Sequence, residues 1–254
     1  MTGKYQRMTD PQWEVIAKYL PVQRKREINL RDVMDAIRFM VCTGIQWRNL
    51  PENFPKWNAV YYYFQKWTAD QTLFRLNAAL NELDRVNNGK EAKPSLLLVD
   101  SQSVKLSPMI GADRGFDAHK KINGRKRQHL TDSGGRIWDA CVHAANIYDA
   151  DGASLLFDEN RMDVWWPRLE KFLTDQHYQG TFSVMATDLG ISFEIRGKIG
   201  DAKGFEVIPI RWVVERTISW SNFCRRLVKD YERTIQNSVS WTICSNIYRI
   251  LRRI

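Results

Sequence analysis

Two aspartates stand where apolar segments give way to polar ones. Asp100 follows the apolar run at residues 96–99, and Asp175 closes the short segment at residues 171–174. A carboxylate at the end of a buried strand is costly unless a cation or a donor pairs with it. Two such carboxylates on neighbouring strands repel each other unless a cation lies between them. We interpret both as candidate metal ligands, with a helix cap or turn as the simpler alternative.

Glu215 is the candidate third ligand. It lies in a helix predicted to begin near residue 210, on a different stripe from the apolar one and one turn from Arg211. A surface Glu–Arg pair is the alternative, and such pairs contribute little to stability. A helix packed on the sheet would complete an oxygen cage for Mg²⁺ or Mn²⁺. Two such ions clamp the attacking and leaving oxygens in phosphoryl transfer.

Other chemistries find no support in the sequence. The four histidines and four cysteines follow no metal or disulfide spacing. Nucleophile-elbow, Walker and dinucleotide glycine patterns are missing from the sequence. No apolar run approaches the roughly 20 residues of a membrane span, and the N-terminus has no signal-peptide core. We therefore expect a cytoplasmic protein with reduced thiols.

The chain is basic, with a formal net charge of +9. A basic surface gains affinity for a polyphosphate by counterion release, so nucleic acid is the expected partner; a solvated basic surface is the alternative. The strip at residues 114–129 could follow a phosphate backbone, and the C-terminal helices offer a second basic face. The candidate DNA-binding residues are Lys105, Lys120, Lys121, Arg125, Lys126, Arg127, Arg211, Arg225 and Arg226.

Two regions of different character must position these side chains. Residues 1–90 predict helices at 8–20, 30–43, 57–68 and 73–86, a module suited to DNA reading or equally to packing and dimerisation. The polar stretch at 87–93 marks a boundary. Beyond it, strands followed by alternating helices indicate a mixed α/β layer with an antiparallel portion. The expected strands are 95–100, 125–131, 136–144, 173–175, 191–195 and 205–208, and the expected helices are 149–157, 165–172, 181–189 and one from 210.

Six segments carry a resemblance to a known family. They are MTDPQW at 8–13, GIQWRNLP at 44–51, VDSQSVK at 99–105, LTDQHYQG at 173–180, RWVVERT at 211–217 and KDYE at 229–232. In this order they resemble bacterial insertion-sequence transposases of the DDE class, in the insertion-sequence-five group. The resemblance implies an α/β, ribonuclease-H-like catalytic domain at 91–254, with a mixed sheet flanked by helices, after an all-helical DNA-positioning module at 1–90. It assigns the DDE triad to Asp100, Asp175 and Glu215.

The resemblance also implies an activity. Two Mg²⁺ or Mn²⁺ ions would support cleavage of double-stranded DNA at terminal inverted repeats and strand transfer into target DNA. Asp100 and Asp175 would share the metals, Glu215 would hold the second ion and orient water, and Arg211 would neutralise phosphate charge. A homodimer in the DNA complex and a bacterial, nucleoid-associated location are expected.

Three positions depart from the family pattern. His177 stands where Gly is usual, Ile208 where Tyr is expected and Asn222 where Lys is expected. These departures leave open a degenerate or domesticated copy that binds DNA without cleaving it. A non-specific metal nuclease is a further alternative.

Overall fold

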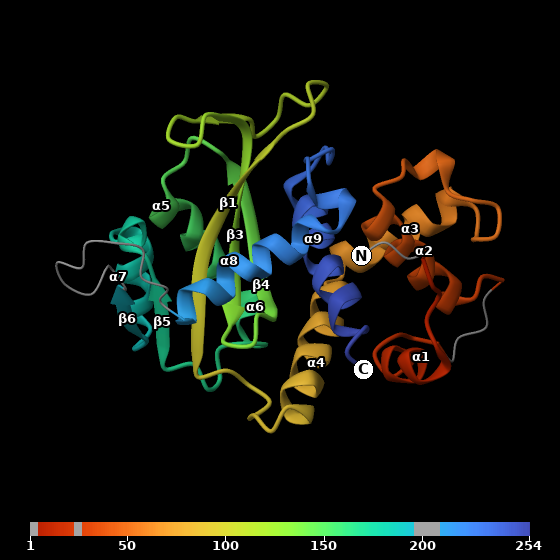
Figure 1. The fold of residues 1–254 in the computed structure, drawn as a ribbon, viewed down its shortest axis with the longest axis horizontal. Helices are drawn as coiled ribbons and strands as arrows, with labels where there is room; N and C mark the ends of the chain where they lie inside the picture. The colour runs from red at the N-terminus through yellow and green to blue at the C-terminus, as the bar shows by residue number, and fades with distance from the viewer. Residues whose placement is uncertain (1–4, 23–26, 196–208) are drawn as a thin grey trace.

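The computed structural model describes residues 5–22, 27–195 and 209–254, without the side chains of residues 209–211. A mixed sheet with its covering helices lies on one side of the molecule, and the N-terminal helices lie on the other (Figure 1). Helix α9 (Ile235–Ile250) runs between them and packs against both.

The four helices predicted for the first 90 residues are confirmed. They are α1 (Asp10–Ala17), α2 (Leu30–Thr43), α3 (Trp57–Ala69) and α4 (Thr72–Asn87), with a 3₁₀ turn η1 (Trp47–Asn49) between α2 and α3. Local signals set their ends. Thr9 and Gln12 form a capping box at α1, and α2 stops at Gly44, whose φ of 69° suits a residue without a side chain.

The sheet has an antiparallel half and a parallel half. In the antiparallel half, β1 (Leu96–Lys105) pairs with β3 (Ile122–Asp132), which in turn pairs with β4 (Ile137–Ala144) and the short β2 (Gly115–Asp117). On its other edge β1 pairs in parallel with β5 (Lys171–Thr174), and β5 pairs in parallel with β6 (Ser192–Ile195). Apart from the short β2, the strands therefore lie in the order β4-β3-β1-β5-β6, with β1 central.

Several predicted elements need correction. The expected helix at 165–172 is wrong: Lys171 and Phe172 belong to β5, and Pro167 cannot continue a helix. β1 does not end at Asp100 but continues to Lys105. The helix expected at 149–157 is α5 (Asp149–Ala153) followed by a 3₁₀ turn, η2 (Ser154–Leu156), and a further short helix, α6 (Glu159–Met162), was not expected. The strand expected at 205–208 lies outside the described residues.

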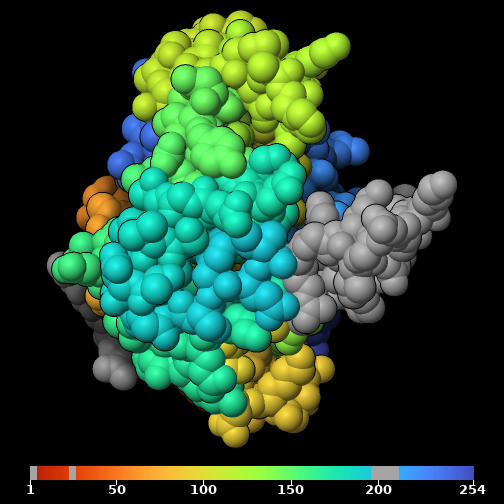
Figure 2. Space-filling view, turned by 90° about the vertical axis from the view of Figure 1, so that its left-hand side faces the viewer, coloured from red at the N-terminus to blue at the C-terminus, as the bar shows by residue number. Residues whose placement is uncertain are grey.

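Helices cover both faces of the sheet. Helix α8 (Pro209–Asn222) crosses one face, where Val214 packs on Leu98 and Leu173 (Figure 1). The opposite face is covered by the segment from α5 to α7 (Thr181–Asp188), which forms the green-to-cyan surface in Figure 2. Within the described ranges, no helix combines the length and apolar character that crossing a membrane requires.

Candidate active site

Asp100 and Asp175 border the same small pocket. In the parallel pairing of β1 with β5, Leu98 lies opposite Leu173. Each aspartate comes two residues after one of these leucines, so both carboxylates project from the face that α8 covers. The pocket is closed by Val214 of α8, the residue before Glu215. The local arrangement follows from the register of the sheet, because residues two positions after a paired Leu98 and Leu173 lie beside each other.

Asp175 also shapes the turn that follows β5. It caps the 3₁₀ turn η3 (Gln176–Tyr178), where its Oδ1 accepts a hydrogen bond from the backbone N–H of His177 at 2.8 Å. The His177 ring Nδ1 lies 3.3 Å from the other carboxylate oxygen, Oδ2. His177 does not have a positive φ, so the loss of glycine here causes no backbone strain. Histidine at this position instead adds a side-chain contact to Asp175, a candidate metal ligand.

Glu215 is exposed. It lies on α8, the helix that covers the face of the sheet from which Asp100 and Asp175 project. Helix α8 is fixed over β1 at two points: Val214 packs on Leu98, and Gln102 of β1 donates a hydrogen bond to Asn222 at 2.9 Å. Asp100 lies between Leu98 and Gln102 on the same face of the strand. In the part of the chain that the structure describes, no three acidic, histidine or cysteine side chains are grouped closely enough to hold a metal ion. The structure thus brings Asp100 and Asp175 together and places Glu215 on the neighbouring helix.

His129 lies directly opposite Asp100 in the pairing of β1 with β3. It is fully buried, and its burial, together with the charge of Arg127, lowers the pKa of the ring to about 3. His129 is therefore neutral near pH 7. It adds no positive charge beside Asp100.

Four of the candidate DNA-binding side chains are buried and contact groups of the protein itself. Arg125 and Arg127 are 0% and 2% exposed and lie near Asp230, which follows the 3₁₀ turn η4 (Arg225–Leu227). Arg127 also donates to the Leu227 carbonyl at 2.7 Å. The other two are Lys126, which pairs with Asp149 at 3.2 Å, and Arg226, which pairs with Glu232 at 2.5 Å. Arg125, Lys126 and Arg127 thus join the C-terminal segment and α5 to the sheet, whereas Arg226 also donates to the Ile45 carbonyl at 3.1 Å.

Four of the remaining candidates are exposed. Lys105 ends β1, and Lys120 and Lys121 lie between β2 and β3, in the segment that is yellow-green in Figures 1 and 2. Arg225 lies in η4. Lys120 Nζ donates to the Ser101 carbonyl at 3.3 Å, next to Asp100. The side chain of Arg211 lies outside the described residues.

Sequence reasoning missed a buried polar group behind the two aspartates. The Tyr178 hydroxyl donates to Gln128 at 2.6 Å, and Gln128 donates to Asp149 at 3.1 Å. Burial, and then the nearby carboxylates Asp100, Asp149 and Asp175, raise the pKa of Tyr178 well above its ordinary value. The available signal was its place in the LTDQHYQG segment, two residues before Gly180.

Comparison with known families defines the class of this protein. Residues 91–249 match the family described as "Transposase DDE domain", and residues 8–77 match the family described as "Putative transposase of IS4/5 family". The first match covers more than half of the chain, which therefore belongs to the transposase DDE-domain family. The predicted ribonuclease-H-like fold and the enzyme class, a DDE polynucleotidyl transferase or endonuclease, are confirmed.

A relative in Sinorhizobium fredii is also similar to this chain. The protein named "Uncharacterized protein y4sN" is 29% identical over 139 residues, which cover 53% of this chain and 92% of that protein. The name of this relative states no activity. The function in DNA transposition thus rests on the family.

Proposed function

We propose that this transposase cuts DNA at the ends of its insertion sequence and joins the freed strands to target DNA, using Asp100, Asp175 and Glu215 as its metal-binding triad. One observation carries the proposal. Asp100 and Asp175 project from adjacent parallel strands into one pocket, and the helix that closes this pocket carries Glu215. Sheet and helix together supply the three acidic positions.

The donor set suits a hard divalent cation. DDE transposase domains generally use divalent metal ions, and carboxylate oxygens are the ligands that Mg²⁺ and Mn²⁺ prefer. Asp100 and Asp175 would hold the ions, two in the proposed site. Glu215 is exposed, so turning its carboxylate toward the pocket opens no part of the core. When bound, the ions would lower the pKa of water and stabilise charge on the phosphate oxygens.

The protein's own residues would position the strand that is cut. Glu215 would orient the attacking water, and later the 3′-hydroxyl, in line with the scissile phosphorus. Lys120, which donates to the Ser101 carbonyl beside Asp100, and the exposed Lys105 at the end of β1 would contact flanking phosphates. Arg211 would neutralise phosphate charge. The helices of residues 1–90 would position the terminal inverted repeats, and a homodimer would hold two ends.

The test replaces each acid by its amide. Asp100→Asn, Asp175→Asn and Glu215→Gln should each reduce Mg²⁺-dependent nicking of the element's own ends more than about 100-fold, since loss of even an outer-sphere partner costs 10–100-fold. Binding to the same DNA should persist. Asp188→Asn, an exposed position at the end of α7, is the matched control and should cut normally. Undiminished nicking by Asp100→Asn would remove this residue from the site.

A second function, DNA binding without cleavage, is favoured by the contact between His177 and Asp175. The ring nitrogen of His177 competes with a metal ion for the carboxylate of Asp175. If the wild-type protein shifts inverted-repeat DNA in a gel but produces no cut strand with either Mg²⁺ or Mn²⁺, the degenerate-copy alternative holds.

A further inference from the structure

The turn η3 passes from one face of the sheet to the other. It begins at Asp175, whose carboxylate projects from the face that α8 covers, and it ends at Tyr178. The Tyr178 ring is 1% exposed and lies edge-on to Phe182 of α7, which covers the opposite face, with 5.9 Å between the ring centres. An acidic residue on one face and a buried aromatic residue on the other are therefore three positions apart in one turn.

A side chain of β3 holds the Tyr178 hydroxyl, which donates to Gln128 Oε1 at 2.6 Å. Gln128 lies opposite Ser101 in the pairing of β1 with β3, and Ser101 follows Asp100 directly. Because successive side chains of a strand point to opposite faces, Ser101 and Gln128 face away from the pocket of the two aspartates. The hydrogen bond thus joins the turn that begins at Asp175 to the strand that is paired with Asp100.

Gln128 is itself fixed by its neighbours. Its side chain is fully buried, and its amide nitrogen donates to Asp149 Oδ1 at 3.1 Å and lies 3.1 Å from His143 Nε2. Lys126 pairs with the same oxygen of Asp149 at 3.2 Å. A carboxylate only accepts hydrogen bonds, so the amide nitrogen of Gln128 faces Asp149 and the amide oxygen faces Tyr178. The acceptor of the Tyr178 hydroxyl therefore has one orientation.

The ring and the hydroxyl of Tyr178 contribute separately. The ring fills apolar space, which a phenylalanine ring would fill equally. The hydroxyl makes a directional hydrogen bond, which fixes where the end of η3 lies relative to β3. Asp175 begins this turn, so the same bond fixes its carboxylate relative to Asp100. Mg²⁺ demands near-ideal octahedral geometry, so a small displacement of one carboxylate would weaken its binding.

We infer that Tyr178 is a positioning residue for the metal site: its hydroxyl, bound to Gln128, holds Asp175 at the separation from Asp100 that a divalent cation requires. Tyr178 is buried on the face away from the pocket, so it acts on the site through Asp175. The consequence for metal binding rests on the proposed function, whereas the link between η3 and β3 does not.

The first arm of the test measures metal affinity without DNA or cleavage. Tyr178→Phe should weaken Mn²⁺ binding about tenfold in titration calorimetry of the full-length protein, since partners that orient metal ligands contribute about 10–100-fold to affinity. Gln128→Met removes the same hydrogen bond from its other end and should weaken Mn²⁺ binding at least as much. The double variant should bind Mn²⁺ as Gln128→Met does, because the two residues act through one bond.

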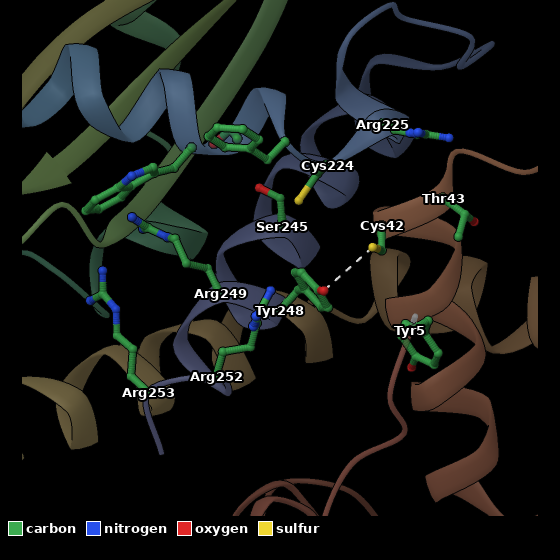
Figure 3. A pocket seen from close by; sticks show the side chains of 13 residues that line it. Tyr5, Cys42, Thr43, Cys224, Arg225, Ser245, Tyr248, Arg249, Arg252 and Arg253 are labelled. Atoms are coloured by element: carbon green, nitrogen blue, oxygen red, sulfur yellow. Dashed lines mark hydrogen bonds between the residues drawn. The ribbon is translucent and has the colours of Figure 1, made fainter. Parts of the chain in front are cut away.

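Tyr5→Phe is the matched control. The Tyr5 hydroxyl donates to the Asp35 carbonyl at 2.7 Å, beside α2, where Tyr5 borders a separate cavity of about 520 Å³ together with Cys42 and Tyr248 (Figure 3). This variant also loses the hydrogen bond of a tyrosine hydroxyl, so it should lower the melting temperature as Tyr178→Phe does but leave Mn²⁺ affinity unchanged. If both variants lower the melting temperature and neither changes Mn²⁺ affinity, the role of Tyr178 is structural alone and the inference is overturned.

The second arm needs no metal. The backbone N–H groups of His177, Tyr178 and Gln179 all donate within η3. In metal-free Tyr178→Phe they should exchange with deuterium several-fold faster than in the wild type, measured by mass spectrometry of peptides covering residues 175–180, whereas Tyr5→Phe should exchange there like the wild type. Unchanged exchange in Tyr178→Phe would overturn the inference. A wild-type protein that binds no Mn²⁺ but shows this difference in exchange would contradict only the proposed function.

Discussion

Leu98 of β1 lies in register with Leu173 of β5, and both pack against Val214 of α8. This apolar contact fixes the distance between sheet and helix at the point where the acidic residues leave each element. Asp100 and Asp175 follow the two leucines by two residues, and Glu215 follows Val214 by one. The active-site geometry proposed above therefore depends on a small hydrophobic cluster beside it.

The first prediction concerns this cluster. Val214→Ala should loosen α8 over the sheet and reduce cleavage more than DNA affinity, because small misplacements of reacting groups are costly. The loss of two methyl groups should also lower the free energy of unfolding by about 1–3 kcal/mol. Val184→Ala on the exposed face of α7 is the control and should change neither property. Equal loss of cleavage in both variants would show that the α8 contact has no special role.

The second prediction concerns His177. Replacing it by Gly, the family residue, removes the ring contact to Asp175 and should strengthen Mn²⁺ binding by no more than about fivefold, since exposed polar pairs contribute at most about 1 kcal/mol. Titration calorimetry with Mn²⁺ measures the change. His119→Gly, in an exposed loop, should leave the affinity as it is. Weaker Mn²⁺ binding by His177→Gly would show that the ring supports the site.

The third prediction separates buried from exposed cations. Arg127→Ala leaves Asp230 without one of its buried partners and should lower the free energy of unfolding by about 3–5 kcal/mol in urea denaturation. Lys121→Ala should leave stability unchanged but reduce the salt slope of DNA affinity by about 1. A stable Arg127→Ala protein with weakened DNA binding would restore the role expected from the sequence.

The fourth prediction is a pH dependence. The folded pKa of His129 is about 3 and its ordinary value is 6.5, so the unfolded chain binds a proton first as pH falls. His129 therefore stabilises the fold above pH 6.5, and this contribution decreases toward pH 3 by up to about 1.4 kcal/mol per pH unit. Urea denaturation at pH 7 and pH 5 should show a smaller loss of stability for His129→Asn than for the wild type. Parallel losses in the two proteins would contradict the assignment.

Local signals allowed much of the fold to be predicted. The capping box at Thr9 and the left-handed Gly44 fix the ends of their helices through contacts within a few residues. The turn at residues 132–135 joins β3 to β4 as expected. The family motifs singled out Asp100 and Asp175, and both border one pocket. The convergence of Glu215 on them stays a prediction.

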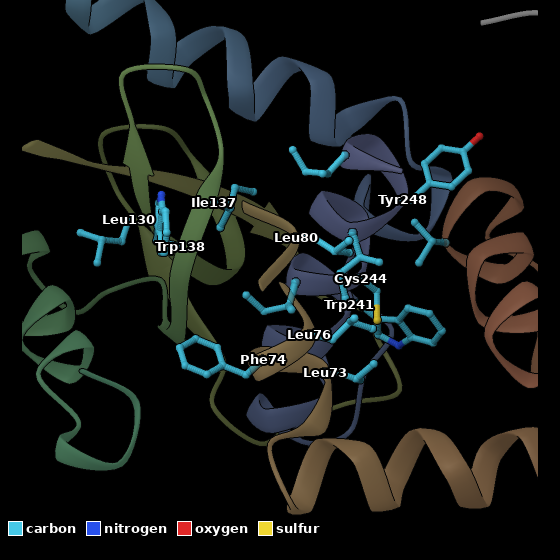
Figure 4. Close-up of a cluster of buried hydrophobic side chains, with 14 of the residues drawn as sticks. Leu73, Phe74, Leu76, Leu80, Leu130, Ile137, Trp138, Trp241, Cys244 and Tyr248 are labelled. Carbon is cyan, nitrogen blue, oxygen red and sulfur yellow. The ribbon is translucent and has the colours of Figure 1, made fainter. Parts of the chain in front are cut away.

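Long-range partners could not be predicted from the sequence. Arg125 and Arg127 belong to a basic strip, and only their contacts with residues about 100 positions later show that they are buried. The same holds for the core in Figure 4, where Leu76 and Leu80 of α4, Ile137 and Trp138 of β4, and Trp241 of α9 belong to one buried apolar cluster. Helix periodicity indicates an apolar face but not what covers it. The division into units at 1–90 and 91–254 likewise stays a prediction.

Anomalous diffraction from crystals of the protein with DNA of its element end and Mn²⁺ tests the central claim most directly. We expect Mn²⁺ peaks within bonding distance, about 2.0–2.2 Å, of carboxylate oxygens of Asp100, Asp175 and Glu215, with a strand phosphate beside them. Manganese bound elsewhere, with Glu215 turned away from a pocket that holds only the two aspartates, would contradict the account.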